Sequence, residues 1–176
     1  SIGFYEIAQI TEGNVMDSPV LLKIAGDVVG KQVFTWKDLA AIDSHWQIDD
    51  VSQVDSKRSG GAIWLRGILE VAEVLPGAKY ITLHSERDDF HASLPLEAVY
   101  ERGMLIYRDK NQPLPVTAGG PVRFFIRDHT ACQATEIDEC ANVKYVEEIE
   151  FSQQKRFDNR PIDDASHAVL HRQEKD

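Results

Sequence analysis

The feature that most limits the fold is a series of short apolar segments with a two-residue period, separated by glycine, proline and polar turns. Successive side chains of a strand point to opposite faces, so this period, together with β-branched residues, is typical of strands. The predicted strands are Val20–Ala25, Trp46–Val54, Ala62–Leu65, Tyr80–His84, Met104–Tyr107, Val122–Ile126 and Val143–Phe151. The chain is therefore predicted to be mostly β.

Helical patterns are few and short. Thr35–Ile42 begins with a threonine and has an acid three residues later, as in a capping box. Ile68–Leu75 ends at a Pro-Gly pair, and Leu96–Arg102 lies between a proline and a glycine. The stretch 109–114, DKNQPL, is predicted to be a turn between two extended runs.

Length and composition indicate one domain. The chain has 176 residues, of which 43% are hydrophobic, enough for a sizeable core and too many for a disordered chain. We predict a domain over residues 1–151 and a polar tail over residues 152–176. The tail is either a partly ordered end of the chain or a segment that docks on a partner.

Charge limits the classes of partner. There are 19 basic and 29 acidic residues, a formal net charge of -10, which argues against general nucleic-acid binding and against an anionic membrane surface. A local basic pocket is still compatible with this charge. No apolar run approaches the ~18 residues of a spanning helix. The sequence starts at serine, which fits an exported protein after signal removal or a trimmed cytosolic one.

Two cysteines, Cys132 and Cys140, lie eight residues apart in a polar stretch. They could form a small disulfide in an oxidising compartment or remain two free thiols. A metal site that adds His129 and either Glu136 or Asp138 is a third option, although the spacing matches no usual zinc pattern.

Residues 117–125, TAGGPVRFF, interrupt the chain with two glycines and a proline just before Arg123 opens an apolar run. Such a stretch is either a plain hairpin entrance or a loop that brings backbone amides and a guanidinium to a ligand. It lacks the lysine and hydroxyl of a P-loop, and the chain shows no dinucleotide-binding glycine pattern. His84 and Ser85 are neighbours on a predicted strand and so point to opposite faces, which does not support nucleophilic catalysis.

The order of several motifs over residues 20–151 resembles the molybdopterin-binding domain of the sulfite-oxidase superfamily. Each motif is weak by itself, and their order and spacing are more specific. The matched positions are Trp64 and Gly67 of the Trp-Gly segment, Ser85, Asp88 and Phe90 of the Ser–Asp–Tyr loop, Gly120, Pro121 and Arg123 of the Gly-Pro-Arg turn, and Lys144 of the last strand. The resemblance implies an α+β, mostly β fold with mixed sheets or a barrel.

The resemblance also implies a pterin pocket in which Arg123 and Lys144 hold the pterin and its phosphate arm. A flat pterin ring is bound by stacked side chains and by a carboxylate that accepts two hydrogen bonds. Candidate ring faces are Trp46, Trp64 and Phe90, candidate donors are Arg66, Arg87, Arg123 and Lys144, and candidate carboxylates are Asp49, Asp50, Asp88 and Asp89. Ser85 and Gly120 complete the set by their motif positions.

Two departures from the family pattern concern the metal. The segment before Trp64 holds no cysteine, although the molybdenum enzymes take a thiolate ligand from it, and Asp or Ser cannot replace a soft thiolate without changing the metal's chemistry. The family also usually has His or Asn where this chain has Ala118. Both changes favour a pterin site without molybdenum.

Small members of this fold that lack the cysteine are similar to this chain and act in bacteria as exported, periplasmic pterin-binding proteins. The resemblance implies a reduced pterin of the monapterin or neopterin type and, as partner, a membrane-bound cyclic di-GMP enzyme. The alternatives are a molybdopterin-dependent oxidoreductase with an atypical metal site and an interaction domain with a vestigial pocket.

Overall fold

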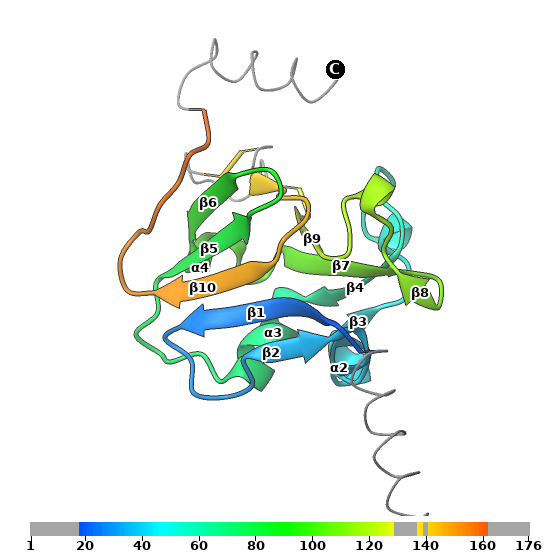
Figure 1. Cartoon of the computed structure of the whole chain (residues 1–176), viewed down its shortest axis with the longest axis horizontal. Coiled ribbons are helices and arrows are strands. Elements are labelled where there is room, and N and C mark those ends of the chain that lie inside the picture. Colours follow the sequence, from blue (N-terminus) through cyan, green and yellow to red (C-terminus); the bar gives the residue numbers. More distant parts are fainter. Residues whose placement is uncertain (1–17, 129–136, 139–140, 162–176) are drawn as a thin grey trace, which may run out of the picture.

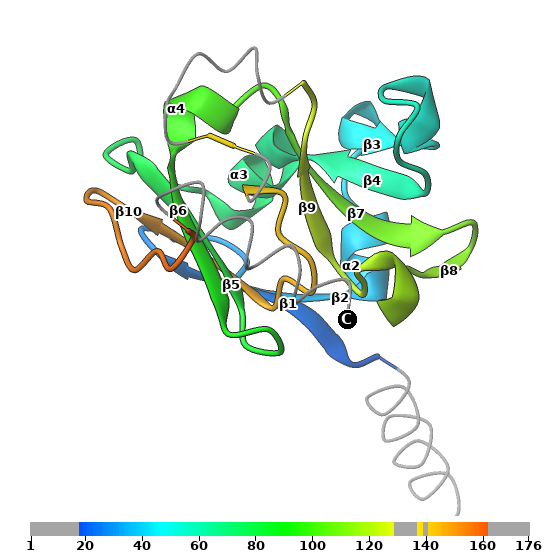
Figure 2. The same ribbon diagram turned by 90° about the horizontal axis from the view of Figure 1, so that it is seen from above.

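A computed structural model describes residues 18–128, 137–138 and 141–161. Its described part contains two sheets with short helices at their edges (Figures 1 and 2). The predicted α+β, mostly β class with mixed sheets is confirmed. The two sheets are open in the described residues, each ending in edge strands, so the barrel that we considered is not formed there.

The first sheet has the order β2-β1-β10-β5-β6 and contains the parallel pair β1–β10, with antiparallel pairs elsewhere. One face is apolar because alternate residues such as Leu22, Leu83 and Ile149 point into the main core. The opposite face carries polar side chains. The strands are β1 (Val20–Gly26), β2 (Val33–Thr35), β5 (Tyr80–Ser85), β6 (Phe90–Pro95) and β10 (Glu148–Ser152).

The second sheet is antiparallel and packs apolar side chains on both faces. Its order is β3-β4-β7-β8, and β9 pairs with β7. Ile63, Leu105 and Phe124 face the main core, whereas Met104 and Phe125 belong to a smaller second cluster on the other face. The strands are β3 (Gln47–Ile48), β4 (Gly61–Trp64), β7 (Gly103–Asp109), β8 (Gln112–Pro113) and β9 (Arg123–Ile126).

The three described helices follow their predicted positions with shifted ends. Helix α2 (Trp36–Ala40) has the predicted capping box, in which Thr35 Oγ1 accepts from the Asp38 N–H at 3.1 Å and the Asp38 carboxylate accepts from the Thr35 N–H at 2.9 Å. Helix α3 (Leu65–Ala72) begins three residues before the predicted start, directly at the end of β4, and ends at the left-handed Glu73. Helix α4 (Leu96–Val99) begins as predicted and ends before Arg102.

Two predicted strands are wrong over most of their length. Within 46–54 the chain forms β3 between the 3-10 turns Ser44–Trp46 and Val51–Gln53, because Asp43 and Asp50 accept hydrogen bonds from the backbone two residues ahead. Within 143–151 only residues from Glu148 onward form a strand, since Tyr145 has a φ of 55° and leaves the extended conformation. Strands β2, β6 and β8 were not predicted, and β8 lies within the stretch 109–114 that was predicted to be a turn.

Residues 153–160, here called the strap, follow β10 and return along the edge strand β6. The Asn159 side-chain oxygen accepts from the His91 N–H at 2.8 Å, and the Asp158 carboxylate accepts from the Ser93 N–H at 3.0 Å. These side chains occupy the place of a further strand. The domain boundary at residue 151 stays a prediction. No helix in the described ranges is both long and apolar enough to cross a bilayer.

Candidate functional site

The Gly-Gly-Pro turn is built by close backbone approach. A 3-10 turn over Val116–Ala118 ends at Gly119, whose φ of 94° is in the left-handed region that favours glycine. A Cβ on Gly120 would overlap the Leu114 carbonyl oxygen and lie 2.5 Å from its carbon. The Gly120–Pro121 peptide is cis. Both glycines are therefore required for the backbone conformation that leads into β9.

Arg123 is the first residue of β9 and points to the outer face of the second sheet. Alternation places it on the same side as Phe125 and opposite Ile106 in register. Its guanidinium donates to the Ala118 carbonyl at 3.2 Å. It lines a cavity of about 220 Å³ whose walls are Lys57, Arg58, Ser59, Gly60, Ile106, Asp109, Leu114, Ala118 and Arg123. We call this the arginine pocket.

Three charged residues of the arginine pocket were not predicted: Lys57, Arg58 and Asp109. The Arg58 guanidinium lies 5.3 Å from the centre of the Phe125 ring and donates to the Lys57 carbonyl at 3.2 Å. Its buried Nε–H has no hydrogen-bond partner among the described residues. Such an unsatisfied donor favours a ligand that offers an acceptor. The signal for these residues was the basic pair in SKRSGG and the acid that begins DKNQPL.

Lys144 lies beside the arginine pocket because of the irregular segment before β10. The Tyr145 N–H donates to the Gly119 carbonyl at 2.9 Å, and the Val146 N–H donates to the Val122 carbonyl at 2.8 Å. A Cβ on Gly119 would lie 3.1 Å from Arg123 Cδ and 3.2 Å from Lys144 Cγ. The turn thus brings together Arg123, Lys144 and Gly120, three of the predicted site residues.

The β5–β6 turn holds Ser85, Asp88 and Phe90. Ser85 is fully buried at the end of β5, and its hydroxyl has no partner in the part of the chain that the structure describes. Asp88 is exposed in the turn, and Phe90 is half-buried against the main core. The Arg87 guanidinium lies 4.8 Å from the centre of the Tyr145 ring. Through Tyr145 this turn adjoins Lys144, but none of its residues lines the arginine pocket.

Trp46 and Arg66 lie in a different place. They line a cavity of about 420 Å³ beside α3, where the Arg66 guanidinium is 5.1 Å from the centre of the Trp46 ring and the Trp46 indole N–H donates to Glu70 at 2.7 Å. Trp64 ends β4 and packs against the second cluster, with the Arg127 guanidinium 5.9 Å from its ring. The structure does not bring these three residues to the arginine pocket.

Three of the four predicted carboxylates, all except Asp88, make local contacts within the described residues. Asp49 pairs with Arg108 at 3.5 Å, and Asp89 contacts His91 at 3.3 Å. Asp50 caps its own turn, and the hydrogen bond from the Ser52 backbone lowers the pKa of Asp50. Asp109 is the carboxylate in the wall of the arginine pocket.

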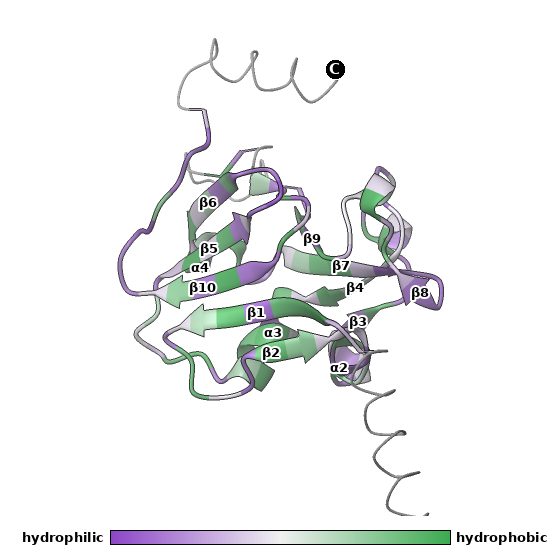
Figure 3. Ribbon diagram, in the orientation of Figure 1, coloured by the Kyte–Doolittle hydropathy of each residue, from purple (hydrophilic) through white to green (hydrophobic). Residues whose placement is uncertain are grey.

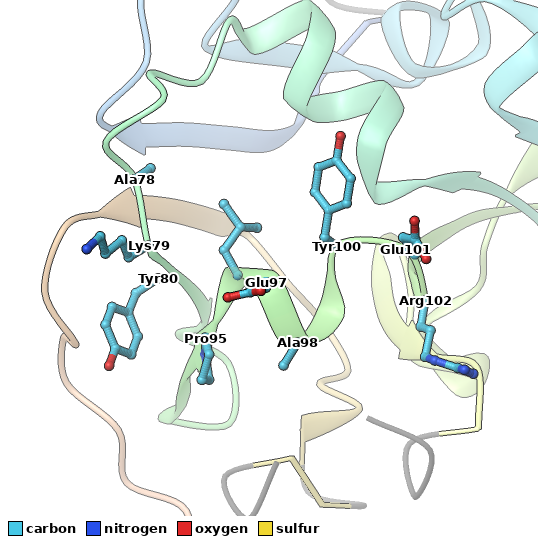
Figure 4. A pocket seen from close by; sticks show the side chains of 10 residues that line it. Ala78, Lys79, Tyr80, Pro95, Glu97, Ala98, Tyr100, Glu101 and Arg102 are labelled. Carbon is cyan, nitrogen blue, oxygen red and sulfur yellow. The ribbon is translucent and has the colours of Figure 1, made fainter. Parts of the chain in front are cut away.

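A broader hollow of about 1000 Å³ lies beside α4 (Figure 4). Its wall includes Lys79, Glu97, Tyr100, Glu101 and Arg102, and none of the predicted site residues. It adjoins the Trp46 cavity through shared residues. We place the candidate site in the arginine pocket, because there a motif arginine, an unsatisfied arginine donor and a carboxylate face one small space.

The described residues contain no group of three or more histidines, cysteines or acids that could hold a metal ion. Among the residues that the structure describes, the lining of the arginine pocket includes a serine and no thiol. Cys132 and Cys140, together with His129 and Glu136, lie outside the described residues, so the disulfide and the metal alternative stay predictions. Asp138 pairs with Arg160 at 3.5 Å.

Comparison with known proteins identifies the family. The family model for the oxidoreductase molybdopterin binding domain matches residues 14–159 of the sequence. No curated protein sequence matches significantly. Among solved structures, the sulfane dehydrogenase SoxCD from Paracoccus pantotrophus is similar, with a TM-score of 0.55 and 16% identity over 78% of this chain, which supports the fold. This chain spans 38% of that dehydrogenase chain. Because the family model matches most of its length, the protein belongs to the oxidoreductase molybdopterin-binding domain family, the sulfite-oxidase-like type that its motifs predicted.

Proposed function

We propose that the chain is a non-catalytic pterin-binding module that senses a reduced pterin of the monapterin or neopterin type. Membership of the molybdopterin-binding family supports a pterin-type ligand. The observation that carries the proposal is the composition of the arginine pocket, whose described lining combines two arginines, a lysine and a carboxylate with apolar residues and contains no thiol. This set suits the polar edge of a pterin, and it offers no soft thiolate for a metal among the described lining residues.

Each group of the pocket has a chemical part in this proposal. Asp109 would accept hydrogen bonds from the ring amide and amino group, while Arg58 and Arg123 would donate to ring oxygen or to an anionic arm. Ile106 and Leu114 offer apolar surface to a ring face. The volume of about 220 Å³ is below the usual range of about 300–1000 Å³ for ligand sites, so a ligand would extend beyond the pocket. Lys144 lies near Arg123 beside Gly119 and is outside the lining of the pocket.

Isothermal titration under anaerobic conditions with tetrahydroneopterin and with oxidised neopterin tests this function. We expect saturable binding of the reduced form, weakened about tenfold or more by Arg123→Ala or Arg58→Ala, since a hydrogen bond to a charged group contributes about 1.5–3 kcal/mol. Arg102→Ala, in the hollow beside α4, is the matched control and should bind as the wild type does.

No saturable heat at about micromolar protein would refute the proposal. Equimolar molybdenum in protein from a cofactor-competent host would favour the oxidoreductase alternative instead. For signalling, we propose that this protein acts in the periplasm on the periplasmic domain of a membrane-bound cyclic di-GMP enzyme. Binding to that domain should then depend on added pterin, because a ligand shifts an equilibrium only if the two states bind it differently.

A further inference from the structure

The outer face of the first sheet carries a pair of histidines that the proposed function does not use. His84 of β5 and His91 of β6 stand opposite each other in register, and their Nδ1 atoms are 2.8 Å apart. Their side chains are 16% and 10% exposed. Figure 3 shows hydrophilic stretches on β5, β6 and β10, the strands that bear this face.

Each imidazole also contacts a carboxylate through its other nitrogen. His84 Nε2 is 3.2 Å from Glu150, and His91 Nε2 is 3.3 Å from Asp89. The four groups form a chain with three contacts, from Glu150 through both rings to Asp89. A carboxylate supplies no hydrogen when ionised, so each end contact needs an N–H from the ring.

The number of ring hydrogens determines which protonation state can satisfy all three contacts between these four side chains. The two end contacts use one N–H from each ring, and the contact between the two Nδ1 atoms needs a third hydrogen. Two neutral imidazoles carry only two ring hydrogens between them. All three contacts are therefore satisfied only when the pair holds one extra proton and is cationic as a whole.

The charges around the pair favour such a cation. Besides Glu150 and Asp89, Glu148 of β10 stands opposite His84 in register, with Lys23 of β1 opposite Glu148 on its other side. The strap adds Arg156, whose Nε is 3.3 Å from Glu150, and the mutually paired Asp158 and Arg160. Carboxylates lie closest to the rings, and the basic groups lie beyond them.

The strap is attached to the same groups. The Phe157 ring centre is 5.3 Å from that of His91, and Asn159 exchanges hydrogen bonds with the His91 backbone at 2.8 and 3.0 Å. His84 holds one oxygen of Glu150 while the other oxygen receives Arg156. A cationic ring pair would strengthen the contact of His91 with the Phe157 ring by cation–π attraction. It would also hold Glu150, the carboxylate that Arg156 contacts, by a charge-assisted hydrogen bond from His84.

We propose that His84 and His91 together bind one proton in the folded protein and that this proton fastens the strap along β6, at the edge of the first sheet. The strap is then held more firmly in acid than in alkaline solution. The inference rests on the described contacts of the strap and does not depend on pterin binding.

Amide hydrogen exchange, read by NMR, tests the proposal at the N–H groups of His91 and Ser93, which donate to the strap. Between about pH 5.5 and about pH 8.5, where imidazole loses its proton, protection relative to the intrinsic rate should fall about tenfold or more in the wild type. Nitrogen-15 spectra of the wild-type imidazoles give a second readout that needs no variant, and should show the shared proton at the acid end.

Asp89→Asn is the matched variant. The carboxamide that replaces the Asp89 carboxylate would present an N–H to His91 Nε2, so two neutral imidazoles then satisfy all three contacts. Asp89 has a φ of 47°, which asparagine tolerates well. Protection in this variant should change less than about twofold over the same range. Equal pH profiles in both proteins, or spectra with one N–H on each ring at every pH, would overturn the proposal.

Discussion

Replacing Gly120 by alanine should destabilise the protein strongly. The added Cβ would overlap the Leu114 carbonyl, at 2.5 Å from its carbon and 2.9 Å from the Pro115 oxygen. These are backbone atoms, so no side chain can rotate to relieve the overlap. The Gly120 N–H also donates to the Pro115 carbonyl at 3.0 Å, and that hydrogen bond would be stretched as the loop moves.

The magnitude follows from these two effects. Overpacking costs about 1–3 kcal/mol and a weakened hydrogen bond about 0.5–1.5 kcal/mol, so the free energy of unfolding should fall by about 1.5–4.5 kcal/mol. For a chain of this length, that corresponds to a melting temperature lower by about 3–18 °C.

Differential scanning calorimetry measures this change, with Gly77→Ala as the matched control. Gly77 is exposed, has no positive φ, and would place its Cβ no closer than 3.4 Å to the Gln153 side chain. Its melting temperature should stay within about 2 °C of the wild type. If Gly120→Ala also melts within that margin, the loop is loose and our account of how it positions Arg123 is wrong.

Three further predictions concern other parts of the fold. Thr35→Ala should lower the free energy of unfolding by about 1 kcal/mol through loss of the capping box, whereas Thr35→Ser should keep most of it, as measured by urea unfolding. Burial alone would raise the pKa of Asp158, but hydrogen bonds from Arg160 and from the Ser93 backbone outweigh it, so the pKa is lowered. The stability from Asp158 is therefore full above the ordinary aspartate value of about 3.9 and is lost as pH falls through the lower folded value. Asp158→Asn should accordingly be less stable than the wild type at neutral pH, and the difference in melting temperature should shrink in acid; a constant difference would contradict this. The Tyr107 hydroxyl donates to Gln47 at 2.8 Å, so Tyr107→Phe should lower the free energy of unfolding by about 1–2 kcal/mol. Burial raises the pKa of Tyr107, so in an absorbance titration of the wild type its phenol should ionise at a higher pH than free tyrosine.

The sequence predicted strands well where alternation matched the pairing of a regular ladder. Strands β1, β4, β5, β7 and β9 alternate between two surroundings, so their apolar residues reveal them. The pattern failed in 143–147 although those residues also alternate, because their backbone groups do not form a regular ladder. Tyr145 and Val146 donate to Gly119 and Val122 before β9, whereas Val143 accepts from Phe124 of β9 and Glu147 donates to His84 of β5. Side-chain periodicity does not record where the backbone donors go. The left-handed conformation of Tyr145 has no residue signature either.

The candidate site residues lie together only where a local sequence motif fixes the backbone. Arg123, Gly120 and Lys144 lie together because the Gly-Gly turn fixes them through backbone contacts that the motif already implies. Trp46 and Arg66 were chosen for chemical type and position near a motif, and these do not determine which face of the sheet a side chain reaches. Lys57 and Arg58 were visible as a basic pair, but only the pairing of β4 with β7 places that loop against Leu114 and Arg123.

The charge of the arginine pocket also could not be inferred from composition. The whole chain has a net charge of -10, yet the pocket gathers Lys57, Arg58 and Arg123 around Asp109. At physiological salt, exposed charges are screened beyond about 8 Å, so a bound ligand experiences mainly the charges of the wall that it touches. Net charge therefore argues against large polyanions, which meet the whole surface, without arguing against a small anionic ligand at this site. The same reasoning explains why binding should depend on Arg58 and Arg123 much more than on the acidic surface elsewhere.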